Sequence, residues 1–138
     1  MEEEVRIPIS SRADIVGARD QGRRMAARLG FGTVDQTLVA TAISELARNI
    51  VLYAGSGEIT IRVVTKDDQQ GIMVVAQDHG PGIPDVEQVM QLGYSTSGGL
   101  GMGLPGVKRI MDHFQISSAP GRGTTVTTIK WRRVSVSP

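Results

Sequence analysis

Two polar side chains with helical spacing could carry the chemistry of this chain. Glu45 and Asn49 are four residues apart, so on a helix they lie one turn above the other. An amide oxygen is a hard ligand that suits Mg2+, and a nearby carboxylate can orient or deprotonate a hydroxyl that attacks a phosphate. Because an arbitrary Glu-x-x-x-Asn is usually a solvent-facing polar pair, this motif needs support from others.

A second motif combines a carboxylate with closely spaced glycines. Asp78 ends a predicted strand and is followed by Gly80 and Gly82. A carboxylate in this place can accept a hydrogen bond from the exocyclic amine of adenine, and glycines let the base approach the backbone closely. The same residue types also dominate ordinary turns, so the motif alone does not decide between the two interpretations.

A third motif is a glycine-rich segment that runs into a predicted helix. Backbone N–H groups freed by glycine, together with a helix N-terminus, make a good site for a triphosphate. The dinucleotide fingerprint is disfavoured because the preceding residues 94–97 read as a loop, and the sequence contains no Gly-Lys-Ser/Thr of a Walker motif. The three motifs in this order predict one ATP site. The residues of the third motif expected to bind ATP are Ser97, Gly98, Gly99, Leu100, Gly101, Met102, Gly103 and Leu104.

Hydrophobic periodicity and capping signals predict the elements that must position these motifs. Ser11 with Asp14, and Thr33 with Gln36, have the spacing of capping boxes at two helix starts. The expected order is β-α-α-β-β-α-loop-α-β-β, with the helices on one face of the sheet. The predicted elements are an edge strand over 5–9, helices ending at Gly30 and near Tyr53, a hairpin of strands 59–64 and 72–76, a short helix over 85–92, a helix from Leu104-Pro105 with Val107, Ile110, Met111 and Phe114 on one side, and strands over 115–119 and 124–131.

Length and charge narrow the class of protein. The 138 residues suit one domain over 1–138, with a short tail after about residue 131 that we expect to fray. Fifteen basic and 14 acidic residues give a formal charge of +1, so neither nucleic acid nor an anionic membrane is favoured as a partner. With no cysteine, an acidic N-terminus and no apolar run of about 18 residues, we expect a cytoplasmic protein without a membrane anchor.

The three motifs together resemble those of the Bergerat-fold ATPases, the GHKL family of histidine kinases, gyrase, Hsp90 and MutL proteins. The segment of Glu45 and Asn49 corresponds to the N box, the motif at Asp78 to the first glycine box, and the glycine-rich segment to the second. Gly123-Thr124 matches the final Gly-Thr, and the resemblance implies that Thr124 helps to bind adenine. It also implies Asn49 as the Mg2+ ligand, Glu45 as the catalytic residue, and an α/β two-layer sandwich with a mixed, mainly antiparallel sheet.

A narrower resemblance concerns the segments 43–50, 94–101 and 103–109, which are similar to the stressosome switch serine/threonine kinases. Those kinases phosphorylate STAS-domain partners in a stress-response partner-switching pathway and, once released, activate a PP2C-type phosphatase. The resemblance implies the same activity here. An anti-sigma factor kinase that sequesters a sigma factor is the alternative, although that subgroup usually has a histidine where this chain has Tyr53. A nucleotide sensor without transferase activity is a third interpretation.

Overall fold

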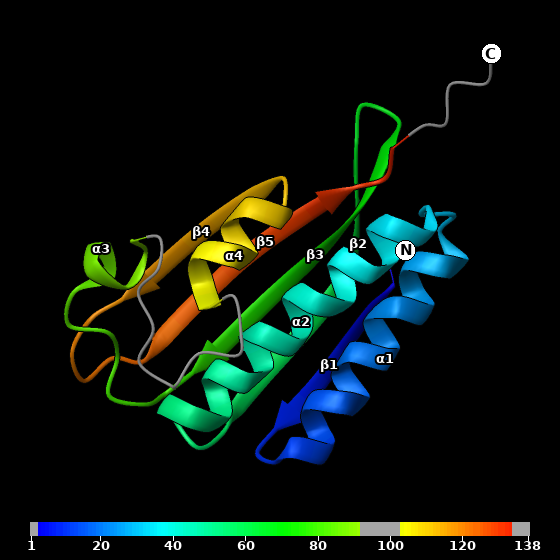
Figure 1. Cartoon of the computed structure of the whole chain (residues 1–138). Helices are drawn as coiled ribbons and strands as arrows, with labels where there is room; N and C mark the ends of the chain where they lie inside the picture. The colour runs from blue at the N-terminus through cyan, green and yellow to red at the C-terminus, as the bar shows by residue number, and fades with distance from the viewer. Residues whose placement is uncertain (1–2, 92–102, 134–138) are drawn as a thin grey trace.

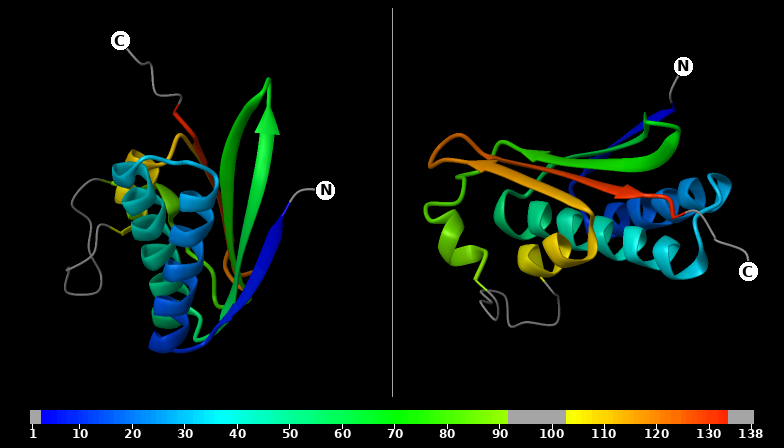
Figure 2. Two further views of the ribbon diagram at one scale, coloured as in Figure 1. Left: turned by 90° about the vertical axis from the view of Figure 1, so that its right-hand side faces the viewer. Right: turned by 90° about the horizontal axis from the view of Figure 1, so that it is seen from above.

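The protein folds into two layers, a five-stranded sheet and helices packed on one of its faces (Figures 1 and 2). The structure is a computed structural model that describes residues 3–91 and 103–133. Within these ranges the order of elements matches the predicted one, and the expected α/β two-layer architecture is confirmed. The elements are β1 (Glu4–Ile9), α1 (Arg12–Arg28), α2 (Thr33–Tyr53), β2 (Gly57–Lys66), β3 (Gln69–Asp78), α3 (Val86–Val89), α4 (Gly103–Ile110), β4 (His113–Ser118) and β5 (Thr124–Trp131).

The sheet has the strand order β1-β2-β3-β5-β4. All four pairings between the described strands are antiparallel, so this sheet is antiparallel throughout, where a mixed and mainly antiparallel one was expected. β1 lies at an edge, where Pro8 is tolerated although it cannot donate a ladder hydrogen bond. β3 and β5 are neighbours, which places Asp78 directly opposite Thr124. Two motifs far apart in the sequence therefore meet at one end of the sheet.

The strands β2 and β3 of this hairpin are longer than the strands 59–64 and 72–76 that the β-branched runs predicted. Its strands are joined by a two-residue turn in which Asp67 and Asp68 have φ angles of 51° and 65°. Two successive positive φ angles match the twist of the flanking strands, and Asp tolerates this conformation better than most residues. The pairing continues to Gly57 opposite Asp78, so the carboxylate occupies the last position of β3, as predicted.

The N-terminus of α1 has the predicted side-chain cap. The Ser11 hydroxyl accepts a hydrogen bond from the backbone N–H of Asp14 at 3.3 Å. The return bond differs from a standard capping box, because the Asp14 carboxylate accepts from the backbone N–H of Ser10 at 2.9 Å. That N–H stabilises the charged carboxylate and lowers the pKa of Asp14. The helix ends before Gly30, which has a φ of +84°.

The capping box predicted at the start of α2 is wrong. Gly32 is the N-cap residue, and among the residues that the structure describes no side chain caps this helix end. Thr33 already belongs to the helix, so its hydroxyl does not occupy the capping position. The side chain of Gln36 instead donates to the carbonyl oxygen of Phe31 at 2.8 Å. At the other end α2 closes as predicted, with Gly55 at a φ of +82°.

The strand after α4 begins earlier than predicted. β4 starts at His113 and not at Gln115, so Phe114 belongs to this strand and not to the helix. The backbone N–H of Asp112 already donates to the carbonyl oxygen of Ile129 at 2.9 Å, so the chain joins the sheet directly after the helix. Phe114 still packs against the core, and an inward-facing strand position happened to coincide with helical spacing.

The core lies between the sheet and the helices and fixes the position of α2. In α1, Gly22 leaves room for the side chain of Ile43, because a Cβ at that position would overlap it. Leu46 and Ile43 of α2 are buried to at least 99%. In residues 3–91 and 103–133 no helix is both long and apolar enough to cross a bilayer. Buried side chains from both layers include Met25, Val39, Ile43, Leu46, Ile59, Ile61, Ile72, Val74 and Val107.

Two glycines in the turn before β5 allow a matched test of how closely this turn packs against the end of β3. Gly123 and Gly121 have φ angles of +75° and +77°, but a Cβ at Gly123 would overlap the carbonyl oxygen of Asp78, whereas at Gly121 it would meet no atom of the described structure within 4 Å. We expect Gly121→Ala to cost only the left-handed backbone penalty, about 1–2 kcal/mol. Gly123→Ala should cost several kcal/mol, on the order of 4. Thermal and urea unfolding would measure both, and equal losses in the two variants would contradict the packing described.

Candidate functional site

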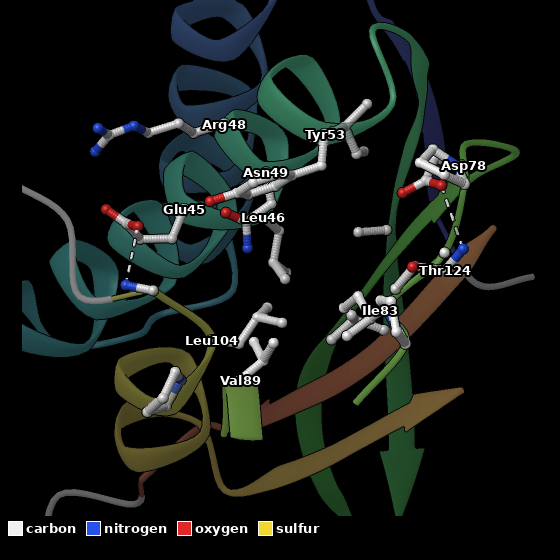
Figure 3. A pocket seen from close by; sticks show the side chains of 18 residues that line it. Glu45, Leu46, Arg48, Asn49, Tyr53, Asp78, Ile83, Val89, Leu104 and Thr124 are labelled. Atoms are coloured by element: carbon white, nitrogen blue, oxygen red, sulfur yellow. Dashed lines mark hydrogen bonds between the residues drawn. The ribbon is translucent and has the colours of Figure 1, made fainter. Parts of the chain in front are cut away.

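α2 presents Glu45 and Asn49 to a cavity, on the side of the helix that their spacing predicted. Both side chains are half-buried, and they border the stripe by which α2 packs on the sheet. Figure 3 shows the two side chains one turn apart, with the amide of Asn49 directed toward the cavity. The buried residues of that stripe are Ala42, Ile43, Leu46, Ala47 and Ile50.

The opposite wall of the cavity carries Asp78 and Thr124. Oδ1 of Asp78 accepts hydrogen bonds from the backbone N–H groups of Gly80 at 2.9 Å and Thr124 at 3.2 Å. In the part of the chain that the structure describes, Oδ2 of Asp78 has no hydrogen-bond partner, and Figure 3 shows it turned toward the cavity. One oxygen thus orders the surrounding backbone, which leaves the other as a fixed acceptor for a ligand donor such as the amine of adenine.

Packing within the protein explains why glycines follow Asp78, and the sequence alone did not reveal this reason. A Cβ on Gly80 would lie 2.6 Å from Cβ of Ala54, at the end of α2. Gly82 has a φ of +80°, and its Cβ would overlap the carbonyl oxygen of Ala119. Both glycines are therefore required by packing within the protein, and their predicted role in admitting the base stays a prediction.

The cavity between these walls is apolar except at its edges. Its volume is about 290 Å³, at the low end of the range of small-molecule sites. α3 closes one side; Asp85 caps it by accepting from the backbone N–H of Gln88 at 3.0 Å. This helix is shorter than the predicted one over 85–92, whose last residue lies outside the described residues. An apolar slot with a fixed acceptor suits a flat heteroaromatic base. The apolar lining includes Leu46, Ile50, Ala76, Ile83, Val89, Leu104 and Val126, together with Pro81, Pro84 and Pro105.

The start of α4 forms the third side and touches the catalytic candidate. The backbone N–H of Gly103, the first residue of α4, donates to Oε2 of Glu45 at 3.3 Å, the bond drawn in Figure 3. The first N–H groups of a helix have no partner within the helix, and a carboxylate beside them is favourable. Gly103 and Leu104 line the cavity, as predicted. The other predicted residues of this motif, Ser97, Gly98, Gly99, Leu100, Gly101 and Met102, lie outside the described residues.

The structure therefore brings the first motif, the second motif and the end of the third around one cavity. Gly80 does not line the cavity but lies behind the wall formed by Asp78 and Thr124, where its backbone N–H donates to Asp78. The predicted residues that line the cavity directly are Glu45, Asn49, Asp78, Gly82, Gly103, Leu104 and Thr124.

Two further polar lining residues were not assigned a site role from the sequence. Arg48 and Tyr53 lie on α2 at the rim, and Tyr53 keeps 48% of its surface exposed. Among the described residues that line this cavity, Arg48 is the one cation, which suits a polyanionic ligand. Helical periodicity could have found both, because Tyr53 follows Glu45 by two turns and Arg48 follows it by three residues.

Comparison with known sequences agrees with the motif-based interpretation. The sequence model of the family described as "Histidine kinase-, DNA gyrase B-, and HSP90-like ATPase" matches residues 34–134. The chain is 57% identical to serine/threonine-protein kinase RsbT of Bacillus subtilis (strain 168) over 127 residues, covering 92% of this chain and 96% of that protein. It is 36% identical to the anti-sigma F factor of Caldanaerobacter subterraneus subsp. tengcongensis over 99 residues, covering 67% and 68% of the two chains.

Solved structures confirm the predicted Bergerat fold. The crystal structure of the RsbU and RsbW domains of Rv1364c from Mycobacterium tuberculosis superposes with a TM-score of 0.66 at 18% identity, covering 98% of this chain and 34% of that longer one. The mycobacterial sensor histidine kinase MprB gives a TM-score of 0.54 at 19% identity, covering 96% of this chain and 99% of that one. At such low identity these similarities concern the fold alone.

The role of Asp78 can be tested by replacing one oxygen of its carboxylate with an NH2 group. We expect Asp78→Asn to lower ATP affinity by at least about 100-fold, because Oδ1 keeps both backbone bonds while an NH2 group replaces the acceptor that faces the amine of adenine. Isothermal calorimetry would measure the affinity. Asp68→Asn, in the β2–β3 turn, is the matched control, because Asn tolerates the φ of 65° there. Unchanged affinity in a folded Asp78 variant would overturn the assignment of Asp78.

Proposed function

The chain belongs to the histidine kinase-, DNA gyrase B- and HSP90-like ATPase family, and on this premise we propose that it is a protein serine/threonine kinase that phosphorylates STAS-domain partners with Mg-ATP. The identity to the kinase RsbT over nearly the full length of both chains carries the proposal. The cavity between the N-box helix and the first glycine box supports it, because both motifs reach the same space.

In this proposal adenine lies in the apolar slot, with its amine donating to Oδ2 of Asp78. Thr124 and the backbone around Gly82 complete the polar end of the slot. The triphosphate extends toward the start of α4, where N–H groups and the positive end of the helix dipole favour anions. The glycine-rich residues 97–102 are proposed to contact the phosphates as well.

The donor groups present fit Mg2+ held jointly by protein and substrate. The described residues contain no cluster of three or more His, Asp or Glu side chains that could hold a metal ion without a ligand. Mg2+ commonly uses one or two protein oxygens and several substrate phosphate oxygens. Asn49 is the proposed protein ligand, because its amide reaches the cavity between Glu45 and the adenine wall, which is the wall formed by Asp78 and Thr124. When bound, the ion neutralises charge on the phosphates.

Glu45 is the proposed catalytic residue. Its carboxylate lies at the side of the cavity where α4 begins, one helical turn from Asn49. There it orients the hydroxyl of a partner serine or threonine and accepts its proton. The hydroxyl oxygen bonds to the γ-phosphorus, the bond from that phosphorus to the β–γ bridging oxygen breaks, and ADP leaves. Positioning and charge neutralisation supply most of the acceleration.

The biological setting is proposed from the same relative. The kinase is proposed to phosphorylate STAS-domain proteins in a stress-response, stressosome-type partner switch and to activate a PP2C-type phosphatase when those partners release it. An anti-sigma factor kinase that sequesters a sigma factor is the second candidate, favoured by the 36% identity to an anti-sigma F factor. Tyr53, in place of the histidine usual in that subgroup, weighs against it.

Two substitutions at Glu45 separate its roles. We expect Glu45→Gln to bind ATP as the parent does and to keep the bond from Gly103, yet to lose phosphate transfer by about 100-fold or more, because the amide is not a base. Glu45→Ala should lose transfer as well and also the link to α4. Calorimetry with ATP and transfer of label from γ-labelled ATP to a STAS-domain partner would measure the two properties. Full transfer activity in Glu45→Gln would contradict a role of Glu45 in catalysis, whereas ATP binding without any transfer by the parent chain would favour a nucleotide sensor.

Affinity capture from extract of the source cells distinguishes the two settings. With the tagged chain as bait, we expect STAS-domain proteins to be retained, and addition of ATP to release them as they become phosphorylated. Glu45→Gln serves as the control, because it should retain the same proteins without release. A sigma factor on the beads in place of STAS-domain proteins or a PP2C-type phosphatase would favour the anti-sigma alternative.

A further inference from the structure

Ser118 lies directly behind the proposed adenine wall and does not line the cavity itself. It ends β4 and is the register partner of Thr124 in β5, which in turn is the register partner of Asp78 in β3. The three side chains therefore form a row across three neighbouring strands at one end of the sheet. Two of them face the cavity, and the third holds one of those two.

The hydrogen bonds of Ser118 fix where its single proton goes. Its Oγ lies 3.1 Å from the carbonyl oxygen of Gly123, 2.8 Å from the backbone nitrogen of Ile83 and 2.8 Å from Oγ1 of Thr124. A carbonyl oxygen can only accept, so Ser118 donates to Gly123, and the N–H of Ile83 donates to Ser118. A serine hydroxyl has one proton, so the proton between the two hydroxyls must come from Thr124.

This arrangement determines what Thr124 offers to a ligand. With its proton directed at Ser118, Oγ1 presents only lone pairs to the cavity. Oδ2 of Asp78, on the same wall, is also an acceptor. In the described residues of this wall the two side chains thus present acceptors and no donor. Such a wall favours a ligand edge that donates.

We propose that Ser118 is a positioning residue that holds Thr124 as an acceptor and thereby makes the site select 6-aminopurine over 6-oxopurine nucleotides. The inference rests on the proposed nucleotide site. Adenine carries an amine with two donor hydrogens at C6, and N1 accepts. Hypoxanthine and guanine carry a carbonyl at C6 and an N1–H, which is the opposite polarity. Thr124 is proposed to serve the adenine edge directly, by accepting from the C6 amine, and a C6 carbonyl in the same place would face its lone pair.

Removal of the Ser118 hydroxyl should change selectivity. In Ser118→Ala the Thr124 hydroxyl is free to rotate and to donate to a C6 carbonyl. We expect the ratio of ATP affinity to inosine triphosphate affinity to fall about tenfold, a change of about 1.4 kcal/mol. Inosine triphosphate is the better probe because it lacks the extra amine of guanine. Ser117→Ala, at the exposed neighbouring position of β4, is the matched control and should leave the ratio unchanged.

A double-mutant cycle tests whether Ser118 acts through Thr124. Thr124→Val should weaken ATP binding, because the acceptor proposed for the C6 amine is lost, and leave inosine triphosphate binding nearly unchanged, since the parent threonine has no proton to give the C6 carbonyl of that ligand. Once Thr124 is Val, adding Ser118→Ala should no longer alter the ratio. This valine variant keeps the proposal testable even where Ser118→Ala does not fold.

Two results would overturn the proposal. One is an equal loss of both affinities in Ser118→Ala, which would make Ser118 a purely structural residue. The other is a Thr124→Val variant that loses inosine triphosphate as strongly as ATP. Each differs from failure of the proposed function, in which the parent protein would bind neither nucleotide in the calorimeter.

Discussion

The carboxylate of Asp78 is the point on which the geometry of the site depends. Through Oδ1 it holds the backbone of Gly80 at the loop after β3 and that of Thr124 at the start of β5, two segments 44 residues apart in sequence. A carboxylate that accepts two backbone N–H bonds is held in one orientation, and that orientation turns Oδ2 to the cavity. The close packing of Gly123 against the carbonyl of Asp78 fixes the same junction from the backbone side. Ordering of the sheet end and presentation of a ligand acceptor are thus two consequences of one side chain.

The other half of the site depends on how α2 is held. Its buried face packs against α1 and the sheet, and the half-buried Glu45 and Asn49 follow from where that face ends. The contact from Gly103 to Glu45 then ties the start of α4 to the same helix. The catalytic candidate, the proposed metal ligand and the helix dipole are therefore brought together by packing, while Asp78 fixes the end of the slot that is proposed for the base. Thr124, held by Ser118, gives that end its polarity.

Much of this could be predicted from the sequence, because the decisive signals are local. The i to i+4 spacing of Glu45 and Asn49, the strand-ending Asp78 and the glycine-rich segment, taken in this order, predicted one shared site. What failed, or was missed, depends on backbone conformation or on contacts between distant segments. The start of β4 was misplaced because an inward-facing strand position at Phe114 coincided with helical spacing. The cap of α2 was assigned to Thr33 because the conformation of Gly32 is not visible in residue types. The hydrogen bond between Ser118 and Thr124 depends on the register of β4 against β5, which no local pattern encodes.

The central claim is that the N-box helix, the first glycine box and the start of α4 grip a single ATP together with Mg2+. A crystal structure of the chain with Mg2+ and a non-hydrolysable ATP analogue tests it most directly. The account predicts the adenine amine within hydrogen-bonding distance of Oδ2 of Asp78, the ion beside the amide oxygen of Asn49, and the phosphates at the start of α4. An analogue bound elsewhere, or one with its base turned away from Asp78 in a well-ordered complex, would contradict it.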